Sequence, residues 1–244
     1  MMTSEPPRSL ALEMACSAVL ERPPSQLNPR ALLTEVIDER YIPFGSPCAL
    51  YIAETMLGCR VRARGALIEV LTPLLQTEPL DAAILSQRNR TRLLRIAERI
   101  APLTEIWRNE LFYTDRAHFV SKRQHVVTPL SIDHLPRGGG VAREHGGRGS
   151  FEGATGVLHK GDVVSYADYA AMSLLVSSIA VFTAPDYRGQ GLGASVVSAA
   201  TEEILELGKI PIYCTDSGNG ASLALCQSLG YMRFGQDLWA FTEP

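Results

Sequence analysis

Apolar residues change their spacing about halfway along the chain. Up to about residue 111 they recur at helical intervals and are interrupted by prolines and glycines, a pattern typical of helices separated by turns. The clearest example is residues 91–101, where four apolar side chains share one face and three arginines and a glutamate occupy the other. This pattern predicts a mainly helical N-terminal domain, which we assign to residues 1–117.

Two shorter N-terminal segments have more specific patterns. Asn28 is typical of a helix N-cap and Pro29 of a first helical turn, so a further helix is expected to bury apolar residues between 32 and 37. Residues 60–64 read Arg-Val-Arg-Ala-Arg and alternate as a strand does, which would place three guanidinium groups on one side. An anion site and an ordinary solvated basic face both remain open for this stretch.

The second half has the alternation of β-strands. A hairpin is expected at residues 154–170, a further strand at 176–183, a helix at 191–207, a strand at 210–214, a helix at 220–229 and a closing strand at 238–241. In the first of these helices Ser195 is expected to face solvent with three glutamates. The order predicts an α+β domain with a mixed, mostly antiparallel sheet flanked by helices, assigned to residues 118–244.

Composition excludes several classes of protein. Hydrophobic residues make up 46% and charged residues 20%, as in ordinary globular chains, and the net charge of −3 gives no basic surplus for nucleic acid. No apolar run is long enough for a membrane helix, and the N-terminus lacks a basic, then apolar, leader, so we expect a cytoplasmic protein. Five scattered cysteines indicate reduced thiols, and the five histidines lack metal-ligand spacing, so no metal is expected.

A glycine-rich junction between the predicted strand at 176–183 and the helix at 191–207 carries the candidate chemistry. Glycines at 189, 191 and 193 lack a Cβ and so let an anion approach the backbone. The helix that follows turns its unpaired N–H groups and the positive end of its dipole toward that anion. The junction therefore predicts a diphosphate cradle, with a tight packing turn as the alternative.

This junction, Arg188-Gly189-Gln190-Gly191-Leu192-Gly193 after Pro185-Asp186-Tyr187, resembles the signature of the GNAT superfamily of acyl-CoA-dependent N-acyltransferases. A second, downstream element of that family is similar to residues 219–231, which begin with Asn219 and end in Gly230-Tyr231. The resemblance covers about residues 124–244. It implies a GNAT-like fold there and acetyl-CoA as the acyl donor.

The resemblance also implies roles for individual residues. The strand before the signature would hydrogen-bond the pantetheine arm, and Asn219 would contact the same arm. The backbone of the signature would hold the pyrophosphate. The implied cofactor-binding residues are Val181, Phe182, Thr183, Arg188, Gly189, Gln190, Gly191, Leu192, Gly193, Ala194 and Asn219.

Two positions depart from the family pattern and concern proton transfer. Many members carry a glutamate on the strand before the signature, but this chain has Ser177-Ser178 there, and Cys226 stands where the family has a proton-donating tyrosine. The catalytic candidates are Cys226, Asp168 and Ser178. Each of the first two has a structural alternative, since Cys226 on an apolar helix is typical of a core thiol and Asp168 of a solvated strand residue.

Together these features predict an N-acetyltransferase in which an amine attacks the thioester of acetyl-CoA directly. The acceptor is open, whether a small cationic amine or a protein or peptide amine, and so is a homodimer. A non-catalytic CoA-binding sensor or scaffold is the alternative from another class. A transferase that uses a longer acyl-CoA is a third interpretation.

Overall fold

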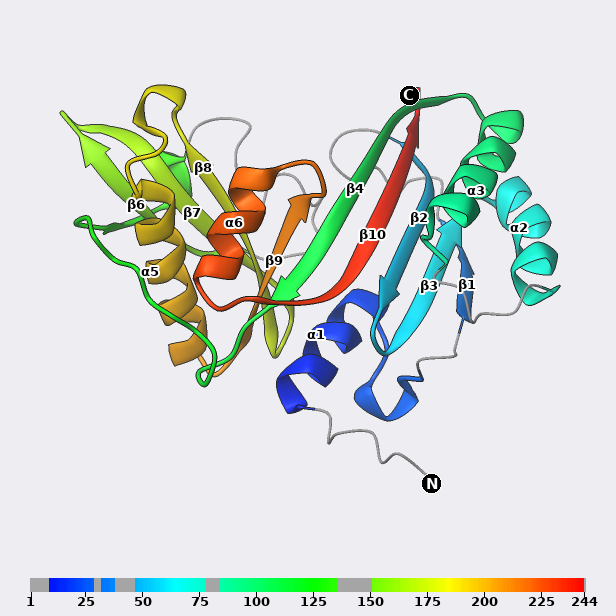
Figure 1. The fold of residues 1–244 in the computed structure, drawn as a ribbon, viewed down its shortest axis with the longest axis horizontal. Helices are drawn as coiled ribbons and strands as arrows, with labels where there is room; N and C mark the ends of the chain where they lie inside the picture. The colour runs from blue at the N-terminus through cyan, green and yellow to red at the C-terminus, as the bar shows by residue number, and fades with distance from the viewer. Residues whose placement is uncertain (1–8, 29–31, 38–46, 78–83, 136–150, 244) are drawn as a thin grey trace.

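The computed structural model describes residues 9–28, 32–37, 47–77, 84–135 and 151–243, and their strands join in one ten-stranded sheet (Figure 1). Only the pairs β1/β3 and β8/β9 are parallel. The α+β class with a mixed, mostly antiparallel sheet is therefore confirmed. The order across the sheet is β1 (Leu32–Val36), β3 (Gly58–Ala63), β2 (Cys48–Thr55), β10 (Met232–Thr242), β4 (Leu103–Tyr113), β9 (Ile210–Asp216), β8 (Val176–Thr183), β7 (Asp162–Ser173), β6 (Phe151–His159) and β5 (Thr128–Leu130).

Helices cover the two faces of this sheet unequally. The helices are α1 (Leu10–Leu20), α2 (Gly65–Thr77), α3 (Gln87–Ile100), α5 (Leu192–Glu206) and α6 (Gly220–Ser228), with short 3-10 turns η1 (Pro24–Gln26), η3 (Ile132–His134) and η4 (Pro185–Tyr187). On β9, Tyr213 packs in the cluster formed with α5 and α6, whereas its neighbour Ile212 packs with α1. Because neighbouring strand residues point to opposite faces, α1 lies on the face away from α5 and α6.

The helical expectation for the N-terminal half is confirmed in part. Helices α1, α2 and α3 form there, and α3 contains the amphipathic segment at 91–101 except for its last residue. The helix expected to begin at Asn28 is wrong, because Leu32–Val36 is the edge strand β1, paired in parallel with β3. Apolar spacing over so few residues does not separate a helix from a strand, and the pairing with β3 decides between them.

The sheet runs without a break between the two halves of the sequence. Leu238 of β10 is opposite Ile52 of β2 on one side and Arg108 of β4 on the other. Strand β4 in turn pairs with β9. The last strand in sequence thus lies among strands of the first half, while the domain division at residue 117 stays a prediction.

Most of the arginine-rich strand expected at 60–64 forms as β3, and the guanidinium groups of Arg60 and Arg62 bind carboxylates of the chain itself, whereas Arg64 donates to the Cys48 carbonyl at 3.3 Å. Arg60 is 4% exposed and pairs with Glu35 of β1 and Glu21 at the end of α1. Arg62 lies within 3.8 Å of the same two glutamates. The pKa of Glu35 is lowered, because the hydrogen bond and charge of Arg60 outweigh the effect of burial. Arg60 and Arg62 therefore belong to an internal ion-pair cluster, and neither of the two sequence interpretations describes them.

The solvent-facing position expected for Ser195 is also wrong. Ser195 and Ser198 of α5 are fully buried beneath the segment that precedes β5. The Ser195 Oγ accepts the backbone N–H groups of Gln124 at 3.0 Å and His125 at 3.2 Å. The Ser195 hydroxyl on α5 thus binds a polypeptide segment instead of water.

Candidate active site

Strands β8 and β9 diverge in the middle of the sheet. They pair in parallel only at residues 176–179 and 210–213. Beyond that point β8 continues to Thr183 along β7, and β9 continues to Asp216 along β4, so each strand keeps only its outer neighbour (Figure 1). The two facing edges therefore carry backbone groups that the ladder leaves for another partner, and an extended ligand can pair with them.

The loop after β8 ends at the N-terminus of α5. Gly189 and Gly191 have φ of 74° and 79°, a left-handed conformation that favours glycine, and Gly191 is the N-cap of the helix. The Ser195 N–H donates to the Gly191 carbonyl at 3.1 Å. The N–H groups of residues 192–194 precede this bond and point out of the helix start, where they favour an anion.

Three elements converge at Gly193: the start of α5, the end of β8 and α6. A Cβ at this position would lie 3.4 Å from the Thr183 Oγ1 at the end of β8 and 3.6 Å from the Leu225 Cδ2 of α6. The end of β8 and α6 therefore each lie within contact distance of Gly193 at the helix start. The implied binding of an extended ligand, with its arm along residues 181–183 and its diphosphate at the start of α5, stays a prediction.

Asn219 lies at the start of α6 and is exposed. Its Oδ1 caps the helix by accepting the Ser222 N–H at 3.1 Å. The cap uses the oxygen, so the side-chain Nδ2 is the group that can donate a hydrogen bond to a ligand. The implied contact with the acyl-donor arm stays a prediction.

The three catalytic candidates occupy two faces of the sheet. Asp168 of β7 is opposite Ala180, and Ser178 of β8 is opposite Ala170, so both side chains lie on the face away from α5. Both are buried, which is contrary to the solvated alternative for Asp168. The structure thus brings Asp168 and Ser178 to the same face, beside the splayed end of β8.

Cys226 lies on the other face, in the core between α5, α6 and β9. It is 0% exposed, and its Sγ donates to the Leu223 carbonyl at 3.2 Å. Burial raises the pKa of the thiol to about 11. These contacts are those of a thiol packed in the core.

A buried acid that the sequence analysis did not select is Asp237, in the middle of β10. It is 7% exposed and accepts a hydrogen bond from the Asn109 Nδ2 at 2.8 Å. Burial raises its pKa to about 7, although the hydrogen bonds from Asn109 and Trp239 act in the opposite direction. The available signal was an aspartate inside the apolar strand that runs from Phe234 to Phe241.

Across the described residues, no group of three or more His, Cys, Asp or Glu side chains is arranged to hold a metal ion. In the same part of the chain, no helix has the length and apolar character needed to cross a membrane.

Comparison with known proteins identifies the C-terminal region. Residues 151–236, from β6 into β10, match the model of the GNAT acetyltransferase family, and this region belongs to the GNAT superfamily. The match covers about one third of the chain and includes the splayed strands, the glycine junction and α6. No curated protein matches the sequence.

Solved structures with similar folds include several acetyltransferases. A putative GNAT acetyltransferase from Novosphingobium aromaticivorans is 16% identical, with a TM-score of 0.47 over 58% of this chain and 67% of that one. A GCN5-related N-acetyltransferase from Kribbella flavida is 18% identical, with a TM-score of 0.44 over 63% and 64% of the two chains. A GCN5-related N-acetyltransferase-like protein from Streptococcus suis is 19% identical, with a TM-score of 0.44 over 63% and 68%.

Proposed function

We propose, on the premise that residues 151–236 are a GNAT region, that the protein transfers the acetyl group of acetyl-CoA to an amine. The observation that carries this proposal is the splay of β8 and β9, which ends at the N-terminus of α5. Strand residues 181–183 would hold the pantetheine arm, and the amides of residues 188–194 would hold the pyrophosphate. Asn219 would donate its Nδ2 to the arm.

The reaction itself needs mainly positioning. A neutral amine attacks the thioester carbon, a C–N bond forms, the C–S bond breaks, and the CoA thiolate leaves. A backbone N–H near Val181, on the unpaired edge of β8, would stabilise the negative charge that develops on the carbonyl oxygen. Holding the two reactants in line supplies several kcal/mol of barrier lowering.

We assign the proton of the acceptor ammonium to Asp168. Its carboxylate lies one strand from the unpaired end of β8 and on the same face as Ser178, which would orient the amine. The leaving thiolate would take its proton from water. Cys226 is left out of the mechanism because its thiol is packed in the core and bonded to the Leu223 carbonyl.

The experiment is an acceptor screen with acetyl-CoA and mass detection of the acetylated product, followed by turnover of Asp168→Asn with the best acceptor. We expect Asp168→Asn to lose about 10²–10⁴-fold in turnover while its affinity for CoA is unchanged, as for removal of a positioned base. Asp162→Asn is the matched control, because Asp162 begins the same strand but is exposed. Equal turnover in the two variants would remove Asp168 from the mechanism.

A non-catalytic CoA sensor is the second candidate. The observation in its favour is that Ser178 and the buried Cys226 stand where the family pattern has proton-transfer groups. Tight CoA binding with no amine-dependent release of CoA across the panel would favour the sensor. Competition with longer acyl-CoAs tests the choice of acyl donor, and a homodimer and a cytoplasmic location stay predictions.

A further inference from the structure

A groove of about 870 Å³ is lined by residues of α2 and α3. These two helices lie beside β1, β2 and β3 (Figure 1). Arginine side chains of α3 line it, together with Leu74 of α2 and Ile96 of α3. We propose that this groove docks an acidic peptide segment of a partner protein, with carboxylates on the arginines and apolar side chains on Leu74 and Ile96. The proposal does not depend on acetyl transfer.

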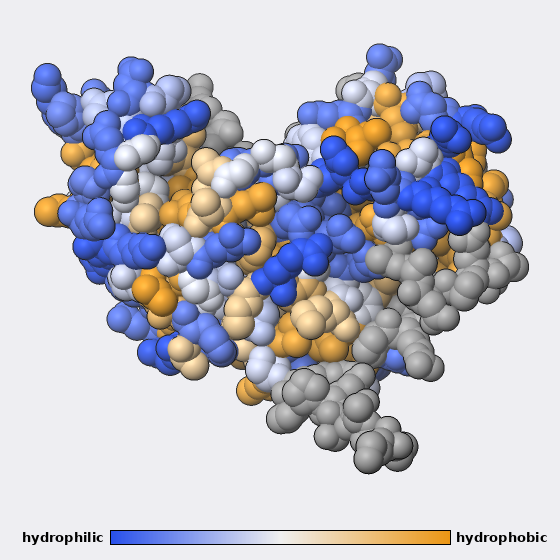
Figure 2. All heavy atoms as spheres, viewed as in Figure 1, coloured by the Kyte–Doolittle hydropathy of each residue, from blue (hydrophilic) through white to orange (hydrophobic). Residues whose placement is uncertain are grey.

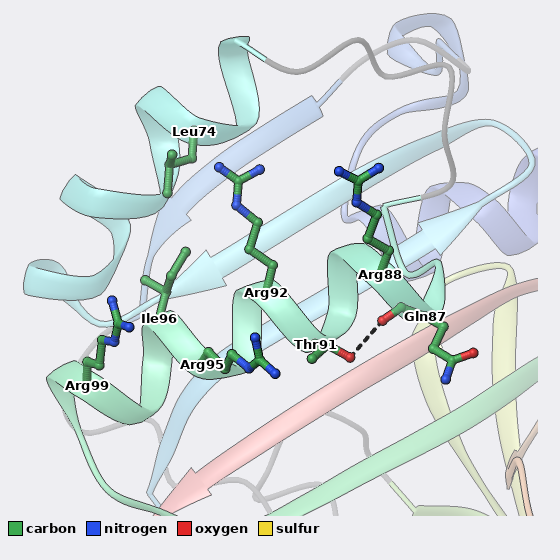
Figure 3. A pocket seen from close by; sticks show the side chains of 8 residues that line it. All are labelled: Leu74, Gln87, Arg88, Thr91, Arg92, Arg95, Ile96 and Arg99. Carbon is green, nitrogen blue, oxygen red and sulfur yellow. Dashed lines mark hydrogen bonds between the residues drawn. The ribbon is translucent and has the colours of Figure 1, made fainter.

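The arginines form a stripe along one side of α3. Arg88, Arg92, Arg95 and Arg99 follow one another at intervals of four, three and four residues, so they extend over about 16 Å of helix. All four are exposed. Figure 3 shows Arg88 and Arg92 extending to the same side of the helix, Arg99 beside Ile96, and Leu74 across from them on α2.

Three arginines of this stripe differ from Arg60, Arg123 and Arg233 elsewhere in the chain. Arg60, Arg123 and Arg233 each have a glutamate partner. Within the residues that the structure describes, no ion pair is formed by Arg88, Arg95 or Arg99. The one acidic residue of α3, Glu98, instead accepts the Leu103 N–H at 3.3 Å.

Like charges four residues apart destabilise a helix. Arg95 and Arg99 form such a pair, so the helix is less stable with them than with neutral residues. A bound anion removes this repulsion. The charge arrangement of α3 thus favours an anionic partner over solvent.

The lining of the groove selects the kind of anion. A guanidinium fork binds a carboxylate with two parallel hydrogen bonds, and half-buried Leu74 and Ile96 offer apolar surface between the arginines. In Figure 2 hydrophilic side chains over α3 adjoin hydrophobic ones of the same lobe. An amphipathic acidic peptide matches both features, as helices do in apolar grooves with charged rims.

Nucleic acid and membrane surfaces match the groove less well. No aromatic side chain is among the described residues that line the groove, so nucleic-acid bases have nothing to stack on. A bilayer requires apolar side chains that project outward, whereas Leu74 and Ile96 lie within the groove. We therefore assign the groove to a peptide.

The test uses fluorescence anisotropy of the full chain with a fluorescein-labelled helical peptide of glutamate, leucine and alanine, whose glutamates repeat at four, three and four residues. We expect saturable binding of the peptide, with an affinity that decreases as the salt concentration rises. The affinity of Arg95→Glu should be at least tenfold lower than that of the wild-type protein. Arg90→Glu is the control, because it makes the same charge change on α3 outside the groove lining, and its affinity should stay within twofold. Thermal melts of both variants verify folding.

A second measurement exchanges the charges. A peptide with lysines in place of the glutamates should bind Arg95→Glu more tightly than the original chain does. The proposal is overturned by the absence of saturable binding, by equal weakening in Arg90→Glu and Arg95→Glu, or by tighter binding of single-stranded DNA or of vesicles rich in anionic lipid than of the acidic peptide.

Discussion

Replacing Gly191 by alanine tests the cradle at the start of α5 directly. Gly191 caps the helix with φ of 79°, and a left-handed residue with a Cβ costs roughly 1–2 kcal/mol. The new Cβ would lie 3.1 Å from the Gln124 Oε1, which is the end of a flexible side chain and can move away. Since domains are typically stable by about 5–15 kcal/mol, Gly191→Ala should still fold.

The chain offers a matched control at the other end of the same helix. Gly208 follows α5 with φ of 75°, and a Cβ there would have no heavy atom within 4 Å. Gly208→Ala therefore carries the same backbone strain without touching the cleft. Urea unfolding should show a similar loss of stability, about 1–2 kcal/mol, in both variants.

Binding should separate the two variants. If the strained turn relaxes, the amides of residues 188–194 rotate away from the phosphates, and each hydrogen bond to a charged group is worth about 1.5–3 kcal/mol. Losing two such bonds corresponds to about 10²–10⁴-fold weaker binding. Calorimetric titration with CoA measures this. A folded Gly191→Ala variant that binds CoA as tightly as Gly208→Ala does would refute the cradle. A wild-type protein that does not bind CoA would refute the proposed function itself.

Three further predictions concern Asp237, Glu35 and Cys226. Burial raises the pKa of Asp237 to about 7, so between pH 5 and 7 the folded chain holds a proton that the unfolded chain has lost. The free energy of unfolding should therefore fall by about 2–3 kcal/mol from pH 5 to pH 7, relative to that of Asp237→Asn. An equal pH dependence of the unfolding free energies of the two proteins in urea would contradict this. The pKa of Glu35 is lowered by Arg60, so Glu35→Gln should cost about 1–3 kcal/mol at pH 7, and the difference should vanish as acid protonates Glu35 in the original chain. Cys226→Ala should keep its turnover within about twofold from pH 6 to 9.5, since a core thiol contributes stability and not proton transfer; a hundredfold loss would make the thiol the acid.

The sequence was most informative where pattern and chemistry are local. The glycine junction, the helix that follows it and the strands on either side are encoded within residues 151–236, and they form as expected. A helix N-terminus with left-handed glycines is determined by its own residues. The family resemblance supported the same predictions in this region, which the family model also matches.

Features that depend on distant residues could not be read in this way. Leu32–Val36 becomes a strand because β3 pairs with it. Arg60 is neutralised by Glu21 and Glu35, which only the fold brings to it, and Ser195 is buried by a segment some seventy residues earlier. Asp237 acquires its raised pKa from strands β2 and β4 on either side. In each case the partner, and not the residue type, decides the outcome.

The position of β10 has a consequence for how the chain folds during synthesis. Strands β2 and β4 leave the ribosome well before residues 232–242, yet β10 lies between them. Until it arrives, both strands present open edges, which other strands can join. Inserting β10 requires contacts between residues far apart in sequence, which makes this step slow. We expect the nascent N-terminal half to depend on protection from aggregation until its central strand has been translated.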